Sequence, residues 1–195
     1  MKNKAQSLCP DYFESLYATD PDPWSFAESE YERKKYATTV GVLSGREIKS
    51  AFEVGCSIGI LTSRLAHYCR SLLSVDVAEQ ALEQARRNCE KSANVRFNRL
   101  EIPREWPGDK FDLIVLSEVL YYFCAEDIRQ IAFKTLSTLA PGGLALLVHW
   151  TGETDYPCQG DPAVECFLAA SGDRLIPLLN RREPKYRLDL LKRKE

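Results

Sequence analysis

The stretch EVGCSIGIL, residues 53–61, follows a short apolar segment and leads into TSRLAHYC, whose apolar residues have the spacing of an amphipathic helix. Two glycines, Gly55 and Gly59, fall in the turn between the predicted strand and the predicted helix. Glycines at such a turn let the backbone come close to a ligand. The stretch therefore predicts a strand, a ligand-binding turn and a helix.

Strands and helices alternate through the rest of the central sequence. We predict strands at 50–54, 71–77, 94–100, 111–119 and 144–150, and helices at 59–69, 78–91 and 126–139, the last ended by APGG at 140–143. Strands that are apolar almost throughout, alternating with helices, indicate a parallel sheet covered on both faces. The predicted fold class is α/β, a Rossmann-like doubly wound sheet.

The two ends of the chain depart from this alternation. Before the first strand we predict a helical cap, residues 1–49, with one helix around Tyr12 to Tyr17, a loop at DPDPW and a helix that begins at Ser29. After the last parallel strand we predict a helix at 163–171 and a hairpin of strands 174–182 and 185–194. The hairpin adds one antiparallel strand to a mostly parallel sheet. We expect one domain over residues 1–195, with its core at 50–195.

Composition narrows the function classes. The seven cysteines are odd in number and form no C-x-x-C pair, which favours reduced thiols in the cytoplasm and indicates no metal module. A net charge of −2 with interspersed signs favours no nucleic acid partner. No segment has the apolar length of a membrane span or the pattern of a signal peptide, so we expect no membrane association. The sequence does not indicate an oligomeric state.

The turn distinguishes two nucleotide ligands. A dinucleotide site has the pattern G-x-G-x-x-G, whereas this turn reads E-x-G-x-S-x-G, with Glu53 inside the strand. A carboxylate would repel a pyrophosphate but would favour S-adenosylmethionine, which carries a sulfonium and an ammonium group. The pattern therefore predicts S-adenosylmethionine as the cofactor.

Two further carboxylates follow in the expected order. Asp76 ends the second strand, where a carboxylate can accept both ribose hydroxyls, and Glu101 follows the third strand, where it can accept from adenine with Ile102 against the ring. Turn glycines can also be purely structural, and an Asp at a strand end can simply cap a helix. The combination of all these residues in order favours the cofactor site.

At this point the residues resemble a known family. The segments FEVGCSIGILTSRLA, SVDV, FDLIVLSEVLYYF and LAPGG resemble class I S-adenosylmethionine-dependent methyltransferases over about residues 50 to 150. With DPDPWSFAESEYERKKY added, the chain is similar to the nodulation protein S family, whose rhizobial members N-methylate a deacetylated glucosamine. The stretch at 149–161 and the C-terminal hairpin differ from that family, which leaves the acceptor open.

The resemblance implies a set of site residues. By the resemblance the cofactor would contact Glu53, Gly55, Cys56, Ser57, Gly59, Asp76, Glu101, Ile102 and Ser117. Apart from the resemblance, we expect Trp24, Lys35 and Val77 at the cofactor as well. Ser57 stands where many members have a glycine. Trp24 is expected to close over the site as a lid from an exposed loop, and Lys35 or Arg33 to pair with the cofactor's carboxylate.

Transfer of a methyl group to an amine needs alignment more than acid–base chemistry, whereas transfer to a hydroxyl needs a base. The catalytic candidates are Glu118, which would orient an amine, Tyr121, which with Tyr122 would wall the pocket, and His149, the preferred base. We therefore predict N-methylation of a small polar acceptor such as an amino sugar. The alternatives are O-methylation of a small molecule and a non-catalytic S-adenosylmethionine-binding protein. The glycine spacing of a dinucleotide site, G-x-G-x-x-G, is missing, which argues against a dehydrogenase.

Overall fold

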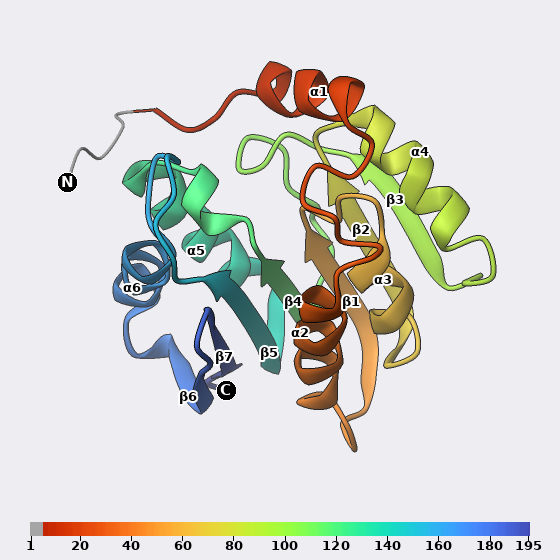
Figure 1. Ribbon diagram of the computed structural model, residues 1–195. Helices are drawn as coiled ribbons and strands as arrows, with labels where there is room; N and C mark the ends of the chain where they lie inside the picture. The colour runs from red at the N-terminus through yellow and green to blue at the C-terminus, as the bar shows by residue number, and fades with distance from the viewer. Residues whose placement is uncertain (1–5) are drawn as a thin grey trace. The chain divides into compact units, whose positions relative to one another are not determined.

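The computed structural model describes residues 6–195 and divides into two compact units (Figure 1). The N-terminal unit comprises residues 9–101, and the C-terminal unit comprises residues 6–8 and 102–195. Residues 1–5 of the predicted cap lie outside the described residues.

The N-terminal unit contains three parallel strands in the order β3-β2-β1. They are β1 (Ile48–Val54), β2 (Cys69–Asp76) and β3 (Val95–Arg99), and the helices are α1 (Pro10–Thr19), α2 (Glu30–Gly41), α3 (Ile60–Leu65) and α4 (Glu79–Asn88). Helix α1 packs against α4, and α2 packs against α3 (Figure 1). Two helices therefore precede the first strand, as predicted.

Local sequence explains where these helices begin and which face they bury. Pro10 occupies the first turn of α1, where its missing N–H costs nothing, and the Ser29 hydroxyl accepts a hydrogen bond from Glu32 N–H at the start of α2. The predicted apolar stripe of α4 is confirmed, since its members are buried: Ala78, Ala81, Leu82, Ala85 and Cys89.

Helix α3 is shorter than the predicted 59–69, and this part of the prediction was wrong. The helix ends at Leu65, and His67 lies in the turn that follows rather than in a helix. The Asn94 side-chain amide donates to both Ala66 O and Cys69 O at 2.9 Å. This contact holds the chain in a turn, from which β2 starts at Cys69.

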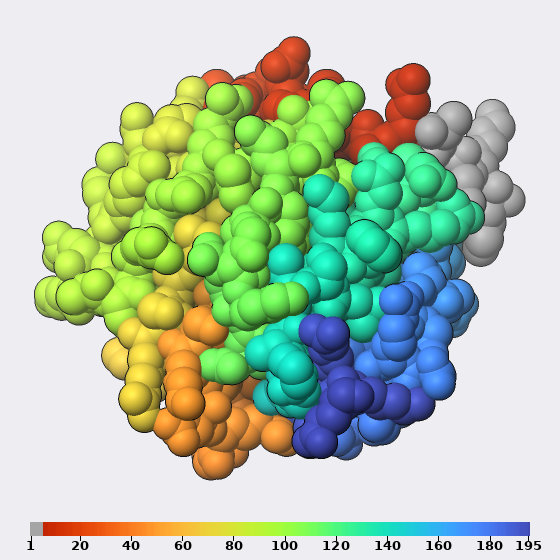
Figure 2. Space-filling model, turned by 180° about the vertical axis from the view of Figure 1, so that it is seen from behind, coloured from red at the N-terminus to blue at the C-terminus, as the bar shows by residue number. Residues whose placement is uncertain are grey.

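The C-terminal unit contains four strands in the order β4-β5-β7-β6. Strands β4 (Phe111–Ser117) and β5 (Leu139–Trp150) are parallel, and β7 (Tyr186–Arg193) runs antiparallel to both β5 and β6 (Leu175–Arg182). Its helices are η1 (Leu120–Tyr122), α5 (Ala125–Thr138), α6 (Gly160–Ser171) and η2 (Gly172–Arg174). Figure 2 shows the end of the hairpin (dark blue) beside the start of β5 (teal). The predicted single antiparallel strand from a C-terminal hairpin, β7, is confirmed.

The APGG segment was predicted to separate α5 from the next strand, but it lies within β5. Leu139 pairs with Phe111, and the register then shifts so that Leu144 pairs with Leu113. Gly142 has φ +72°, and a Cβ on Gly143 would lie 2.9 Å from the Ala140 carbonyl oxygen. Glycines therefore form a bulge here, and the strand starts directly at the end of the helix.

Within residues 6–195, no helix combines the length and the apolar character that crossing a membrane requires.

The turn glycine Gly59 provides a test of this packing. It has φ +80°, and a Cβ would lie 2.9 Å from both Cα and Cβ of Ala85 in α4. Because both the conformation and the contact exclude a side chain, Gly59→Ala should lower the free energy of unfolding by roughly 1–3 kcal/mol or more, measured by urea denaturation.

Gly41→Ala is the matched control in the same unit. A Cβ at Gly41 would meet nothing within 4 Å, and the residue ends helix α2. Its stability should stay the same or rise by up to about 1 kcal/mol. Equal effects of the two substitutions would contradict the close packing of the turn on α4.

Candidate functional site

The turn after β1 is anchored to the end of β2 by its own backbone. The N–H groups of Gly55 and Cys56 both donate to the Val75 carbonyl oxygen, at 2.8 and 2.9 Å. Gly55 and Gly59 have φ values of +72° and +80°, a region that glycine enters without steric cost. The predicted glycine turn is thus present, and both of its glycines adopt the positive φ that the turn requires.

Ser57 adopts φ +50°, which is strained for a residue with a side chain. Two hydrogen bonds hold it there. Its N–H donates to Asp76 Oδ2 at 2.8 Å, and its hydroxyl lies 2.5 Å from the Tyr17 hydroxyl. Burial raises the pKa of Tyr17, so its phenol is neutral and can take part in this bond as donor or acceptor. The side chain at the usual glycine position therefore ties α1 to the turn.

Asp76 is the centre of these contacts. Its Oδ1 accepts from Ala78 N–H at 3.0 Å, just before α4, while Oδ2 accepts from Ser57. It is 9% exposed, and burial raises its pKa although the backbone donors act in the opposite direction. Each carboxylate oxygen has a second lone pair, so a further donor such as a ribose hydroxyl is compatible with this geometry.

Glu53 lies behind the turn rather than at its surface. It is 2% exposed, and its Oε2 accepts from the hydroxyls of Thr62 at 2.7 Å and Ser74 at 2.8 Å. Burial raises its pKa to about 7, although both hydroxyls lower it. The predicted location beside the ligand's amino acid part therefore needs correction, because Glu53 braces β1 against α3 and β2.

Trp24 was predicted to be an exposed lid, and the structure corrects this. It is partly buried against the cluster of Tyr17, Ile58, Ala78 and Ala81, and it stacks on Phe26 with ring centroids 5.4 Å apart. The Asp22 carboxylate accepts from the N–H groups of Phe26 and Ala27, which orders this loop. Trp24 thus packs against the cluster that contains Ile58, a residue of the turn.

Lys35 was predicted to pair with a cofactor carboxylate, but its ammonium already has a partner. It is 3% exposed and lies 2.8 Å from Glu32, which is also buried. Arg33 is exposed and pairs with Glu30 at 3.9 Å. Lys35 and Glu32 form a buried ion pair within α2, and removing either member would leave a buried charge uncompensated.

The residues predicted to frame the nucleoside are divided between the units. Val77 and Glu101 belong to the N-terminal unit and Ile102 to the C-terminal unit, and each is half-buried. Val77 directly follows Asp76, and its carbonyl oxygen accepts from Arg99 Nε at 2.8 Å. Cys56, also predicted at the cofactor, is buried beneath the turn with Leu82 and Ala85.

In the C-terminal unit, the end of β4 carries a second strained residue. Ser117 is buried, and Glu118 has φ +56° with its N–H donating to the Val148 carbonyl oxygen at 2.8 Å. Its Oε2 accepts from the Tyr121 hydroxyl at 2.7 Å and from Trp150 N–H at 2.9 Å. Glu118 and Tyr121, which were predicted separately as catalytic candidates, are therefore in direct contact.

Three tyrosines pack together next to Glu118. Tyr121 is buried, with its ring stacked on Tyr156 at 5.4 Å, and Tyr122 lies edge-on to both, at 4.8 and 4.7 Å. Burial, and then the charge of Glu118, raises the pKa of Tyr121 well above its usual value, so it acts as a neutral donor. Sequence reasoning flagged the stretch 149–161 but did not single out Tyr156.

His149 was the preferred general base, and the geometry does not support that role. Its side chain is 0% exposed, and Nε2 accepts from Leu120 N–H at 3.1 Å. The lone pair that would take a proton is thus engaged in fixing the start of η1. Its ring also lies edge-on to Tyr121, at 5.8 Å, which indicates a structural role for this histidine.

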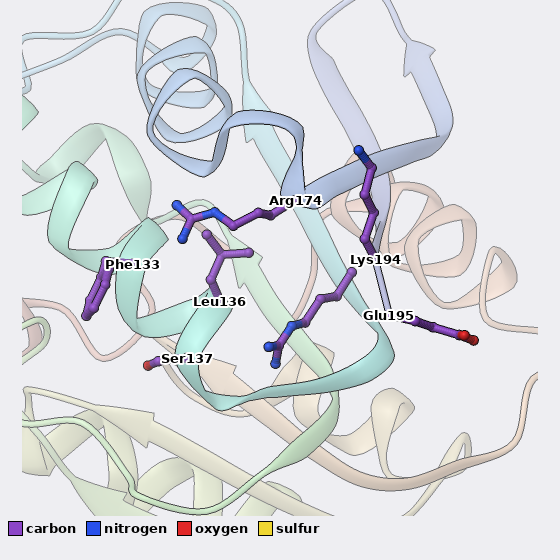
Figure 3. A pocket seen from close by; sticks show the side chains of 7 residues that line it. Phe133, Leu136, Ser137, Arg174, Lys194 and Glu195 are labelled. Atoms are coloured by element: carbon purple, nitrogen blue, oxygen red, sulfur yellow. The ribbon is translucent and has the colours of Figure 1, made fainter.

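A hollow of about 370 Å³ lies elsewhere in the C-terminal unit, between α5 and the end of β7. In Figure 3 Arg174 reaches toward Leu136, while Lys194 and Glu195 point away from it. Arg174 donates to the carbonyl oxygens of Ala170 and Ser171, and Lys194 pairs with Asp173. Arg174 therefore binds carbonyl groups at the end of α6, and Lys194 forms an ion pair just after β7.

Among the described residues, no group of three or more His, Cys, Asp or Glu side chains is placed to hold a metal ion.

Comparison with known proteins gives consistent results. The family model of Nodulation protein S (NodS) matches residues 11–147. Nodulation protein S of Rhizobium tropici is 36% identical over 124 residues, which are 63% of this chain and 52% of that protein. The chain thus spans about half the length of this curated relative.

Two solved structures are similar over most of the chain. The N-methyltransferase NodS from Bradyrhizobium japonicum WM9, in complex with S-adenosyl-L-homocysteine, has a TM-score of 0.82 at 22% identity, covering 95% of this chain and 98% of that chain. A putative methyltransferase from Pseudomonas syringae has a TM-score of 0.73 at 33% identity, covering 85% and 100%. This likeness confirms the predicted Rossmann-like fold class.

The buried Glu53 predicts an unusual pH dependence of stability. Its pKa is about 7 in the folded protein against an ordinary value of 4.5, so the folded state binds more protons between these values. The free energy of unfolding should therefore fall as the pH rises through this window, by roughly 3 kcal/mol at most. Denaturation of the unmodified protein and of Glu53→Gln at pH 5, 6, 7 and 8 should show a smaller fall in the variant, where only other buried carboxyls such as Asp76 contribute.

Glu47→Gln serves as the control, because Glu47 is an exposed carboxylate that pairs with Arg70. Its stability should follow that of the unmodified protein at every pH. Parallel curves for Glu53→Gln and the unmodified protein would show that Glu53 does not titrate in this range.

Proposed function

We propose that this chain, which belongs to the Nodulation protein S family, is an S-adenosylmethionine-dependent methyltransferase that N-methylates a small polar acceptor. The observation that carries this proposal is the turn Gly55–Gly59, held in its strained form by Asp76. The NodS structure from Bradyrhizobium japonicum WM9 contains S-adenosyl-L-homocysteine, which supports the same cofactor here.

The residues at the turn fit this cofactor. Gly55 and Gly59 keep side chains away from the turn, and Asp76 retains lone pairs for ribose hydroxyls. Asp76 brings a carboxylate to this end of the unit, which suits a ligand with a sulfonium and an ammonium group. A pyrophosphate would be repelled by the same carboxylate. When bound, the cofactor supplies an activated methyl group.

The C-terminal unit contributes groups suited to an amine acceptor. Glu118 is held by the Tyr121 hydroxyl and by Trp150 N–H, so its carboxylate is fixed in direction. We propose that this carboxylate binds the amine through a hydrogen bond and so fixes the direction of the nitrogen lone pair. Orientation of this kind can supply roughly 7–11 kcal/mol of a barrier. The amine loses its proton without a strong base.

O-methylation is less well supported. A hydroxyl acceptor needs a base, and the histidine that could act as one is buried with Nε2 already accepting from Leu120 N–H. We therefore favour an amine, with an amino sugar or related metabolite as the candidate.

We further propose that residues 1–195 act as one methyltransferase domain, with a small-molecule acceptor and no nucleic acid partner. A cytoplasmic location is supported by the cysteines, since all seven are free thiols: Cys9, Cys56, Cys69, Cys89, Cys124, Cys158 and Cys166. Proteins of oxidising compartments commonly pair such residues.

Calorimetric titration with S-adenosylhomocysteine tests the proposal. The unmodified protein should bind in the micromolar range, and Asp76→Asn should weaken binding at least about tenfold, or ~1.4 kcal/mol, because it removes a charged acceptor. Glu79→Gln is the control: it removes a negative charge at the start of α4, where Glu79 pairs with Arg86. It should bind like the unmodified protein.

Thermal unfolding of each variant, measured in parallel, separates loss of the ligand site from loss of the fold. Absence of binding by a folded, unmodified protein would overturn the proposed cofactor. Tight binding without transfer to any amine or hydroxyl acceptor would support the non-catalytic alternative instead.

A further inference from the structure

The hollow between the end of α5 and the end of β7 combines apolar and cationic side chains. Phe133 and Leu136 of α5 line it together with Arg174, Arg193 and Lys194 of the C-terminal segment. Its volume of about 370 Å³ falls within the range of small-molecule sites, roughly 300–1,000 Å³. The hollow therefore has room for a compact ligand.

The hollow lies at the opposite end of β5 from Glu118. Arg193 Nη1 donates to the carbonyl oxygen of Leu139, where β5 begins. Glu118 accepts from the N–H of Trp150, where β5 ends. At about 3.3 Å per residue, this strand spans roughly 30 Å. The hollow is therefore separate from the residues proposed to orient the acceptor.

Two guanidinium groups of the hollow are fixed by backbone carbonyl groups. Arg174 donates to two carbonyl oxygens at the end of α6, at 3.1 and 3.3 Å, and Figure 3 shows its side chain reaching toward Leu136. A guanidinium has five N–H groups. Within residues 6–195, hydrogen bonds use two of them in Arg174 and one in Arg193. Both groups are thus held in place and keep N–H groups for a further acceptor.

The charge around the hollow is strongly positive. Residues 174–195 contain eight Lys or Arg and three Asp or Glu, although the whole chain has a net charge of −2. Lys194 pairs with Asp173 at 3.1 Å, and in Figure 3 Glu195 points away from Leu136. The guanidinium groups of Arg174 and Arg193 form no ion pair with a carboxylate of the described residues. The local potential therefore favours an anion.

An apolar surface adjoins these charges. Phe133 is 64% exposed, which makes it the most exposed large apolar side chain of residues 6–195. Leu136 follows three residues later, on the same face of α5. An exposed aromatic ring gains by contact with another flat apolar surface. Together with the arginines, this surface suits a molecule that has both a ring and an anionic group.

We propose that this hollow is a second ligand site, which binds a small organic anion built on a flat ring. The carboxylate or phosphate of the ligand accepts hydrogen bonds from Arg174 and Arg193, because a guanidinium matches the oxygens of either group. The ring contacts Phe133 and Leu136. Both arginines lie outside residues 11–147, which match the family, and the site does not depend on the proposed methyl transfer.

Titration of the isotope-labelled full chain with phenyl phosphate and with benzoate, followed by NMR, tests the proposal. At least one probe should shift the backbone N–H signals of residues 133–139 and 172–175, saturating with a Kd of about 1 mM or tighter. Shifts with phenyl phosphate alone would identify a phosphate ester as the ligand, shifts with benzoate alone a carboxylate, and shifts with both an anion of either kind. Saturating S-adenosylhomocysteine should leave the Kd unchanged, which separates the hollow from the turn Gly55–Gly59.

Two simpler probes separate the ring from the charge. Inorganic phosphate has the charge without the ring, and phenol has the ring without the charge. Each should bind at least about fivefold more weakly than the better of the two ring anions, because each lacks one of the two contacts.

Three variants locate the site. Arg174→Gln removes one guanidinium and should raise the Kd of the ring anion at least about fivefold. Phe133→Leu should raise the Kd of the ring anion but leave that of inorganic phosphate unchanged. Arg181→Gln is the matched control, since it makes the same change of charge at an exposed residue that pairs with Glu183 and does not line the hollow. It should bind like the unmodified protein.

Thermal unfolding shows whether each variant is folded, and Phe133→Leu decides the test if Arg174→Gln does not fold. Absence of saturable shifts with both ring anions would overturn the proposal, as would shifts confined to other parts of the chain. Equal weakening by Arg174→Gln and Arg181→Gln would also overturn it, because binding would then reflect only the overall charge. None of these outcomes affects the proposed methyltransferase function.

Discussion

The buried carboxylate of Asp76 is the constraint on which the N-terminal unit depends. One oxygen accepts from Ser57 N–H and the other from Ala78 N–H, so the turn after β1 and the approach to α4 are joined through a single side chain. A buried carboxylate without such donors would be costly, and these two compensate part of its desolvation. The close contact of Gly59 with Ala85 follows, because α3 can then begin directly against α4.

Strained backbone occurs after one strand of each unit. Ser57 follows β1 and Glu118 follows β4, and both have positive φ although neither is glycine. Such strain persists only where surrounding contacts enforce it, and it concentrates at functional positions. Asp76 and Tyr17 enforce it at Ser57, and Val148 with Trp150 enforces it at Glu118. We propose that Ser57 serves cofactor binding and that Glu118 serves acceptor orientation.

The strand and helix pattern could be predicted from the sequence because apolar spacing and turn glycines act locally, as in the buried stripe of α4. The direction in which a buried side chain points could not be predicted from the sequence. Strands β1 and β5 are apolar on both faces, so the alternation that would show where Glu53 and His149 point is missing. The contact of Tyr156 with Tyr121 joins residues far apart in the chain, and no local pattern reports it. Trp24 was misplaced for a similar reason, because its partners in the cluster around Ile58 come from other elements.

The central claim is that the turn Gly55–Gly59 binds the adenosyl cofactor in its strained conformation. A crystal structure of the full chain grown with S-adenosylhomocysteine tests it most directly. The account predicts that the ligand lies against Gly55 and Gly59, that its ribose hydroxyls donate to Asp76, and that Ser57 keeps its positive φ. A ligand bound elsewhere would contradict this. So would a ligand that breaks the hydrogen bond between Asp76 and Ser57 and lets Ser57 lose its positive φ.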